Sequence, residues 1–213
     1  MTEWWAQIVR PTLEQGSSRE FTESMVSGLY DYFSGAEPYQ LDSAVDGLFL
    51  DWKKKGFNIG ILSNSDPRLR QVVKDFDLEK FLYSPDAYSI SYEVDYEKPD
   101  MRIFKDAEER LKQHLAGSDR ERDGFPARTS AVSGFWHVGD DLDKDFYGAL
   151  GAGWNAVLID KSRKYLENPN PVLKGMRDGD EVEDIQESVK LIKSTPMRII
   201  CDTLDSLHEV FDS

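Results

Sequence analysis

The sequence predicts an α/β fold in which helices cover both faces of a parallel β-sheet. Short apolar segments alternate with amphipathic segments from about residue 57 to the end of the chain, which is typical of such a sheet. Two of the apolar segments run directly into polar residues, at Ser63 and at Asp140. Because ligands bind at the carboxyl ends of strands in open parallel sheets, we expect the functional site at this edge.

The first forty residues are predicted to be helical. Apolar residues recur at helical spacing in two stretches of residues 2–34, which Gly16-Ser17-Ser18 separates. A third helix is predicted to begin near Ser43 and to end at Gly56. No segment before residue 43 has the alternation of a strand.

Strands and helices alternate in the rest of the chain. The 116–130 segment, rich in charge and glycine, is predicted to be a surface loop. An acidic loop insertion is expected at about 161–195, because this segment contains Asn-Pro-Asn-Pro and a dense run of acids. The predicted strands are 57–62, 87–90, 135–138, 154–159 and 198–201.

Composition narrows the possible partners and location. A formal net charge of −14 over 213 residues argues against nucleic acid or an anionic membrane as partner. Cys201 is the single cysteine, so an internal disulfide is excluded. The sequence has neither a signal peptide nor an apolar run of the ~20 residues that a membrane helix needs. We therefore expect a cytoplasmic protein, with a nuclear pool also compatible; its oligomeric state stays open.

Three short motifs contain the residue types that phosphoryl-transfer sites use. They are Ser63-Asn64 after the first strand, Lys98 in Glu97-Lys98-Pro99-Asp100, and the acids of the segment 137–145. A hydroxyl and a backbone N–H bind phosphate oxygens, an ammonium neutralises charge, and carboxylates hold a divalent cation. Each motif alone also fits a turn, a surface lysine or a helix cap. His137 lies inside an apolar strand and is interpreted as a packing histidine.

Taken together, the ordered motifs resemble the haloacid dehalogenase-like hydrolase superfamily, in particular its group called haloacid dehalogenase-like hydrolase domain-containing protein three. The second motif of that superfamily is an apolar strand ending in Ser or Thr, here Ser63. The third is a Lys, here in Lys98-Pro99-Asp100. The fourth is an apolar strand leading into Gly-Asp, here Gly139-Asp140, followed by a further acid, here Asp141 or Asp145. The resemblance covers about residues 43–160 well.

The resemblance implies Mg²⁺-assisted phosphoryl transfer from a small phosphorylated metabolite through an aspartyl-phosphate. Asp140 would bind Mg²⁺, and Asp141 or Asp145 would support it. Ser63 and Asn64 would bind the phosphoryl oxygens. Lys98 would neutralise the charge between nucleophile and phosphate.

The first motif of the superfamily, Asp-x-Asp-x-Thr, has no counterpart here, because no Asp-x-Asp pair precedes Ser63. Asp51 follows an apolar run, but its context is that of a helix end. The resemblance then implies a partial helical cap at residues 1–42, a core at 43–213, and a central first strand that is absent between the strands ending at Ser63 and Asp140. We expect this chain to be inactive and to bind Mg²⁺ weakly. A truncated gene model and a non-catalytic pseudoenzyme with a binding or regulatory role both remain open.

Overall fold

The computed structural model describes residues 2–15, 22–117, 134–172, 181–186 and 189–211. The chain divides into two compact units, each described by itself below. The first unit comprises residues 1–41 and 67–80, and the second comprises residues 42–66 and 81–213.

The first unit is helical, as predicted. It contains α1 (Thr2–Glu14), α2 (Glu23–Ser34) and α4 (Arg68–Asp75). The Trp5 ring contacts the rings of Tyr30 and Phe33, with centroids 6.4 and 6.3 Å apart. The Arg68 guanidinium lies 4.1 Å from the centroid of Trp5, so a cation–π contact joins α1 to α4. The assignment of residues 1–42 to a partial cap stays a prediction.

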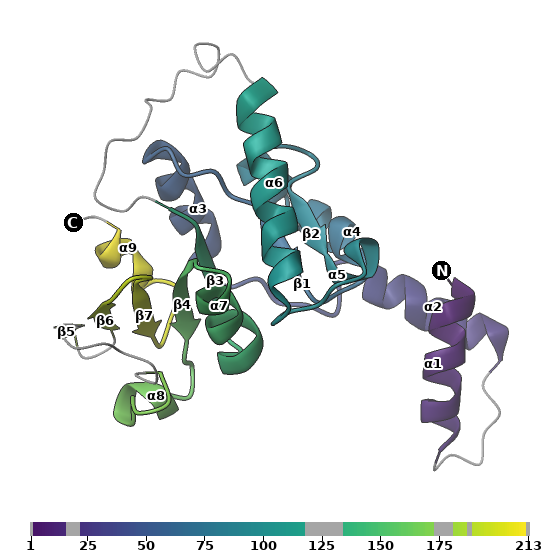
Figure 1. Ribbon diagram of the computed structural model, residues 1–213. Helices are drawn as coiled ribbons and strands as arrows, with labels where there is room; N and C mark the ends of the chain where they lie inside the picture. Colours follow the sequence, from purple (N-terminus) through teal and green to yellow (C-terminus); the bar gives the residue numbers. More distant parts are fainter. Residues whose placement is uncertain (1, 16–21, 118–133, 173–180, 187–188, 212–213) are drawn as a thin grey trace. The chain divides into compact units, whose positions relative to one another are not determined.

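The second unit contains two β-sheets (Figure 1). In the first sheet, β1 (Ile61–Ser63) pairs in parallel with β2 (Tyr88–Ile90). In the second, the strand order is β3-β4-β7-β6-β5; β3, β4 and β7 run parallel, and β6 and β5 are antiparallel to their neighbours. The strands of this sheet are β3 (Trp136–Gly139), β4 (Asn155–Ile159), β5 (Glu181–Gln186), β6 (Val189–Lys193) and β7 (Arg198–Cys201).

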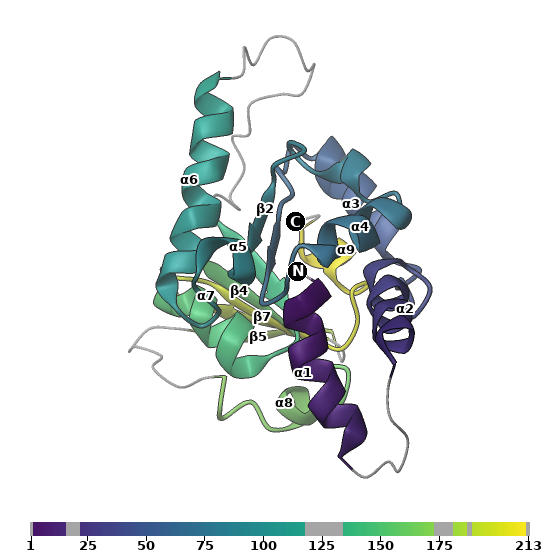
Figure 2. The ribbon, with the colours of Figure 1, turned by 90° about the vertical axis from the view of Figure 1, so that its right-hand side faces the viewer.

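The helices of the second unit cover both faces of the five-stranded sheet (Figure 2). Ala156 and Leu158 of β4 pack in a cluster with residues of α6 and α7, whereas the intervening Val157 and Ile159 pack in a cluster with residues of α3 and α9. This alternation is the two-residue period of a strand that is buried on both faces. The helices are α3 (Val45–Lys54), α5 (Ser91–Val94), α6 (Met101–Gly117), α7 (Gly148–Gly151), α8 (Lys164–Glu167) and α9 (Leu207–Val210), with a π-helix, η2 (Leu142–Tyr147). A short 3₁₀ turn, η1 (Glu79–Phe81), lies where the chain passes from the first unit to the second.

The structure differs from the sequence prediction between residues 161 and 195. The acidic loop expected there contains α8, β5 and β6, and β6 extends the sheet by pairing with β7. Val189 and Ile192 of β6 are buried and Leu191 packs against the core, so three apolar residues anchor a strand whose other two residues are lysines. Residues 173–180, with part of the acidic run, lie outside the described residues, as do residues 118–130 of the other predicted loop.

The separation of β1 from β3 agrees with the expected absence of a central strand. Within the described residues, β1 pairs only with β2 and β3 pairs only with β4. No described helix is long and apolar enough to cross a membrane.

Candidate functional site

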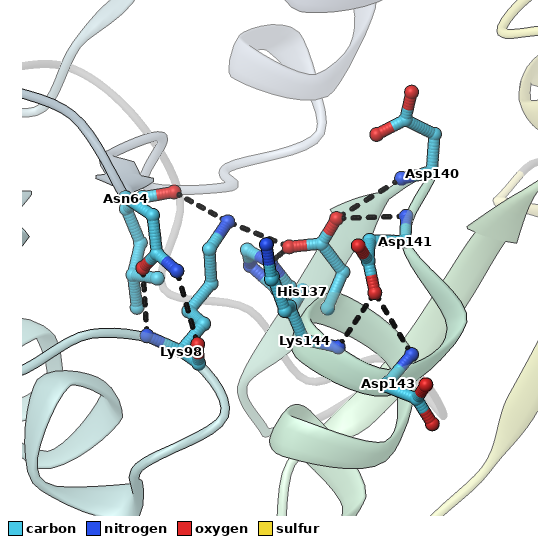
Figure 3. A network of polar contacts seen from close by, with 9 residues as sticks. Asn64, Lys98, His137, Asp140, Asp141, Asp143 and Lys144 are labelled. Atoms are coloured by element: carbon cyan, nitrogen blue, oxygen red, sulfur yellow. Dashed lines mark hydrogen bonds and ion pairs between the residues drawn. The ribbon is translucent and has the colours of Figure 1, made fainter.

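A lysine connects β1 to Asp145, which lies in η2 after β3. The Lys98 side chain, 12 % exposed, comes from the segment between α5 and α6. Its Nζ donates to Asp145 Oδ1 at 2.6 Å and to the backbone oxygen of Leu62, in β1, at 3.3 Å (Figure 3). The ammonium therefore lies beside the residue that precedes Ser63.

Asn64 holds the backbone of Lys98. The Asn64 Oδ1 accepts from Lys98 N at 2.6 Å, and Asn64 Nδ2 donates to the Lys98 carbonyl oxygen at 3.0 Å. These two bonds fix the peptide groups on both sides of the lysine to the end of β1. The predicted role of Asn64 as a phosphate ligand stays a prediction, because the described contacts engage its amide with Lys98.

Asp145 is the centre of the network. Its Oδ1 accepts from Lys98 Nζ and contacts His137 Nε2 at 3.0 Å, while its Oδ2 accepts from the backbone N of Asp140 and Asp141 at 3.1 and 3.0 Å. Burial favours a raised pKa for this carboxyl, but the hydrogen bonds from His137, Lys98 and the backbone outweigh burial, so that the net pKa of Asp145 is well below its usual range. Asp145 is thus a buried carboxylate with four hydrogen-bond partners.

The turn after β3 is shaped to bring Asp145 back to the strand. Asp141 caps η2, and its Oδ1 accepts from the backbone N of Asp143 and Lys144 at 3.0 and 2.8 Å. A β-carbon at Gly139 would lie 2.3 Å from the Asp145 carboxyl group. Only a glycine leaves room for the carboxylate at that position.

Two other predicted site residues have no side-chain contact with this network. The Asp140 side chain is exposed, points away from Lys98 and His137 in Figure 3, and accepts no hydrogen bond from the described residues. Ser63 is the last residue of β1, and its hydroxyl also has no hydrogen bond to a described residue. The structure therefore brings together Asn64, Lys98 and Asp145 with the backbone of Asp140.

The described residues fit Mg²⁺ only in part. No group of three or more metal-ligating side chains occurs among them. Asp145 has all its acceptor positions in use, and one oxygen of Asp141 is occupied by the cap. The Asp140 carboxylate and Asp141 Oδ2 remain, which suits a cation that keeps most of its water ligands.

The contact between His137 and Asp145 was not predicted from the sequence. His137 is 8 % exposed, as a packing residue would be, yet its ring nitrogen contacts Asp145. Burial lowers the pKa of His137, and the hydrogen bond to Asp145 opposes this in part. The alternation of residues along a strand could have indicated this contact, because His137 precedes Gly139 by two residues and therefore lies on the same face of β3. Asp51, by contrast, lies in α3 and pairs with Lys55 at 2.7 Å, as its helical context predicted.

Sequence comparison finds curated proteins that are similar to this chain. The haloacid dehalogenase-like hydrolase domain-containing protein 3 of Bos taurus is 26 % identical over 159 residues, covering 74 % of this chain and 55 % of that protein. The glyceraldehyde 3-phosphate phosphatase of Methanothermobacter thermautotrophicus is 27 % identical over 143 residues, covering 67 % and 54 %. The chain spans between about half and two thirds of the length of the curated relatives it matches.

A solved structure shares the fold. The HAD-hydrolase YfnB from Bacillus subtilis, solved bound to magnesium, has a TM-score of 0.58 at 15 % identity, covering 99 % of this chain and 72 % of that one. The family model of the haloacid dehalogenase-like hydrolases matches residues 2–153, well over half of the sequence. This chain therefore belongs to the haloacid dehalogenase-like hydrolases.

Proposed function

We propose that this chain carries the phosphate-binding part of a Mg²⁺-dependent phosphatase site for small phosphorylated metabolites. The observation that carries the proposal is the position of the Lys98 ammonium, which is largely buried and held by Leu62 O and Asp145 at the end of β1. A fixed ammonium at a strand end stabilises the charge of a phosphoryl group. The relative named glyceraldehyde 3-phosphate phosphatase supports a small phosphorylated substrate.

Each residue then has a role that its place permits. Ser63, at the end of β1, would bind phosphoryl oxygens with help from Asn64, whose amide also holds the Lys98 backbone, and Lys98 would neutralise their charge. Asp140 with Asp141 would hold the cation, whose contribution when bound is further neutralisation of the phosphate. Asp145 supports these residues indirectly, because its own oxygens are engaged.

The chain as given lacks the nucleophile for the covalent route. No Asp-x-Asp pair precedes Ser63, and Asp51 belongs to α3. Without an attacking carboxylate, the aspartyl-phosphate does not form, whatever the phosphate affinity. We accordingly propose that this chain binds phosphate without turning it over. The cytoplasmic location and the division into a partial cap and a core stay predictions.

The second candidate function is that of a non-catalytic binding or regulatory protein. The observation that favours it is the pairing of Lys98 with Asp145, since a carboxylate within the site already neutralises the ammonium. A pseudoenzyme of this kind and a phosphatase lacking its nucleophile both bind phosphate. They differ in whether activity appears when the missing motif is supplied.

Hydrolysis of p-nitrophenyl phosphate with Mg²⁺ tests the activity. We expect no turnover above background, but binding of inorganic phosphate that Lys98→Met weakens and Lys144→Met leaves unchanged. Lys144 is the matched control, because it is an exposed lysine in the same unit. Hydrolysis that disappears in Asp140→Asn would show that the chain has its own nucleophile. Equal phosphate binding by the two lysine variants would refute the role of Lys98.

A further inference from the structure

We propose that His137 is a positioning residue: it fixes the Asp145 carboxylate and, through it, the Lys98 ammonium. Nothing in the family resemblance or in the comparisons assigns a role to this histidine. The inference rests on the proposed function where it concerns phosphate, but the geometry of the network can be tested without any ligand.

The first argument is the shape of β3. His137 and Gly139 lie two residues apart, so both face the same side of the strand. The Asp145 carboxyl occupies the place where a β-carbon of Gly139 would lie, at 2.3 Å, and it contacts His137 Nε2 at 3.0 Å. One face of a four-residue strand therefore provides both the space for a carboxylate and a group that binds it.

The second argument is the fixed orientation of the imidazole. The ring of Phe104 meets the His137 ring edge to face, with centroids 5.4 Å apart and an interplanar angle of 86°. Phe104 is fully buried and also packs against Trp154, so the position of its ring is fixed by packing. Because the partner of Nε2 is an ionised carboxylate, which only accepts, we assign the proton of His137 to Nε2.

The third argument is the division of the Asp145 oxygens. Two backbone N–H groups hold Oδ2, and His137 and Lys98 share Oδ1. Loss of the His137 donor leaves Lys98 as the only group holding Oδ1 among the described residues, so Oδ1 can shift while the backbone still holds Oδ2. The ammonium then keeps its bond to Leu62 O, but its second partner no longer has a fixed position.

Two substitutions separate positioning from packing. In His137→Gln the amide nitrogen lies about as far from Cβ as Nε2 of histidine does, so the donor is retained. His137→Met has nearly the same length and volume but no donor. A histidine that only packs would be replaced equally well by both.

Two measurements on the full chain follow from this. The ¹H–¹⁵N NMR signal of the Lys98 ammonium reports its environment, and titration with inorganic phosphate reports its availability. We expect His137→Gln to keep the wild-type Lys98 signal and its phosphate affinity within about twofold. For His137→Met we expect a shifted or broadened signal and affinity about tenfold weaker, since a hydrogen bond to a charged group is lost.

The outcomes that overturn the proposal are distinct. An unchanged Lys98 signal in His137→Met means that the histidine only packs, and equal losses in both variants mean that the donor does not matter. Should His137→Met fail to fold, His137→Asn replaces it, because its amide nitrogen falls short of Nε2; a wild-type Lys98 signal in that variant refutes positioning. If the wild-type chain does not bind phosphate, the proposed function fails, while the Lys98 signal still decides the role of His137.

Discussion

Asp145→Asn is the sharpest test of the charged network, because it changes the charge and one acceptor atom with little change in volume. Both oxygens of Asp145 accept hydrogen bonds, from His137 and Lys98 on one side and from two backbone N–H groups on the other. An asparagine accepts on one atom only. Whichever way the amide is turned, one pair of donors faces an NH₂ group.

The expected magnitude follows from burial. The Lys98 and Asp145 side chains are 12 and 7 % exposed, so the ammonium left behind is poorly hydrated. Removal of one partner of a buried ion pair costs about 3–5 kcal/mol, which is a large part of the stability of a typical domain. We expect a loss of this size in the free energy of unfolding at pH 7.

Urea unfolding followed by tryptophan fluorescence measures this loss as a fall in the midpoint at an unchanged m-value. Asp143→Asn is the matched control, because Asp143 is an exposed acid of the same turn with the same change of charge. Its effect should stay within about 0.5 kcal/mol. Equal midpoints for the two variants would refute the reasoning, since the network would then contribute no more than an exposed carboxylate does.

Three further predictions concern the same site. Gly139→Ala should destabilise the protein by about 1–3 kcal/mol in the same urea assay, because the new methyl group overlaps the Asp145 carboxyl. Gly151→Ala is the control and should have little effect, because nothing lies within 4 Å of a β-carbon at that position. The pKa values of His137 and Asp145 are lowered on folding, so the stability that they contribute is complete above about pH 6.5. As the pH falls, this stability is lost first through protonation of His137 and then, below about pH 4, through protonation of Asp145. Thermal unfolding from pH 7 to pH 3 should show this decline, and a rise in stability on acidification would contradict it. Mg²⁺ should bind weakly, with Asp140→Asn abolishing the heat measured by calorimetry, and a micromolar or tighter constant would contradict the partial ligand set.

The fold was largely predictable because parallel strands leave a strong local signal. Apolar runs that end in polar residues identified the strands that end at Ser63 and Gly139, and the helices between strands followed from their spacing. The hairpin of β5 and β6 was not predictable in the same way. It lies at the edge of the sheet, where polar residues are tolerated, and among the side chains that the structure describes there Val189 and Ile192 are the buried ones.

The residue types of the site were predictable, but their contacts were not. Lys98 and Asp145 are 47 positions apart, and no local pattern indicates that they pair. The choice between Asp141 and Asp145 stayed open in the sequence for a similar reason. Asp141 caps the helix that follows it, a local interaction, whereas Asp145 turns back to β3 because Gly139 leaves room for it.

The burial of the strands connects the site to the stability of the fold. In a parallel sheet covered on both faces, strands inside the sheet are normally the most buried. Here β2 is fully buried and most of β4 is, whereas β1 is half-buried throughout and β3 is buried only at His137. The described strands β1 and β3 each pair on one side only.

Lys98 supplies one hydrogen bond to the open edge of β1, at Leu62 O, and reaches the β3 side through Asp145. The same ammonium thus ties the two strands together and serves as the proposed phosphate ligand. A phosphate that draws Lys98 away from Asp145 weakens this tie, so phosphate affinity and the rigidity of the two strand ends should oppose each other.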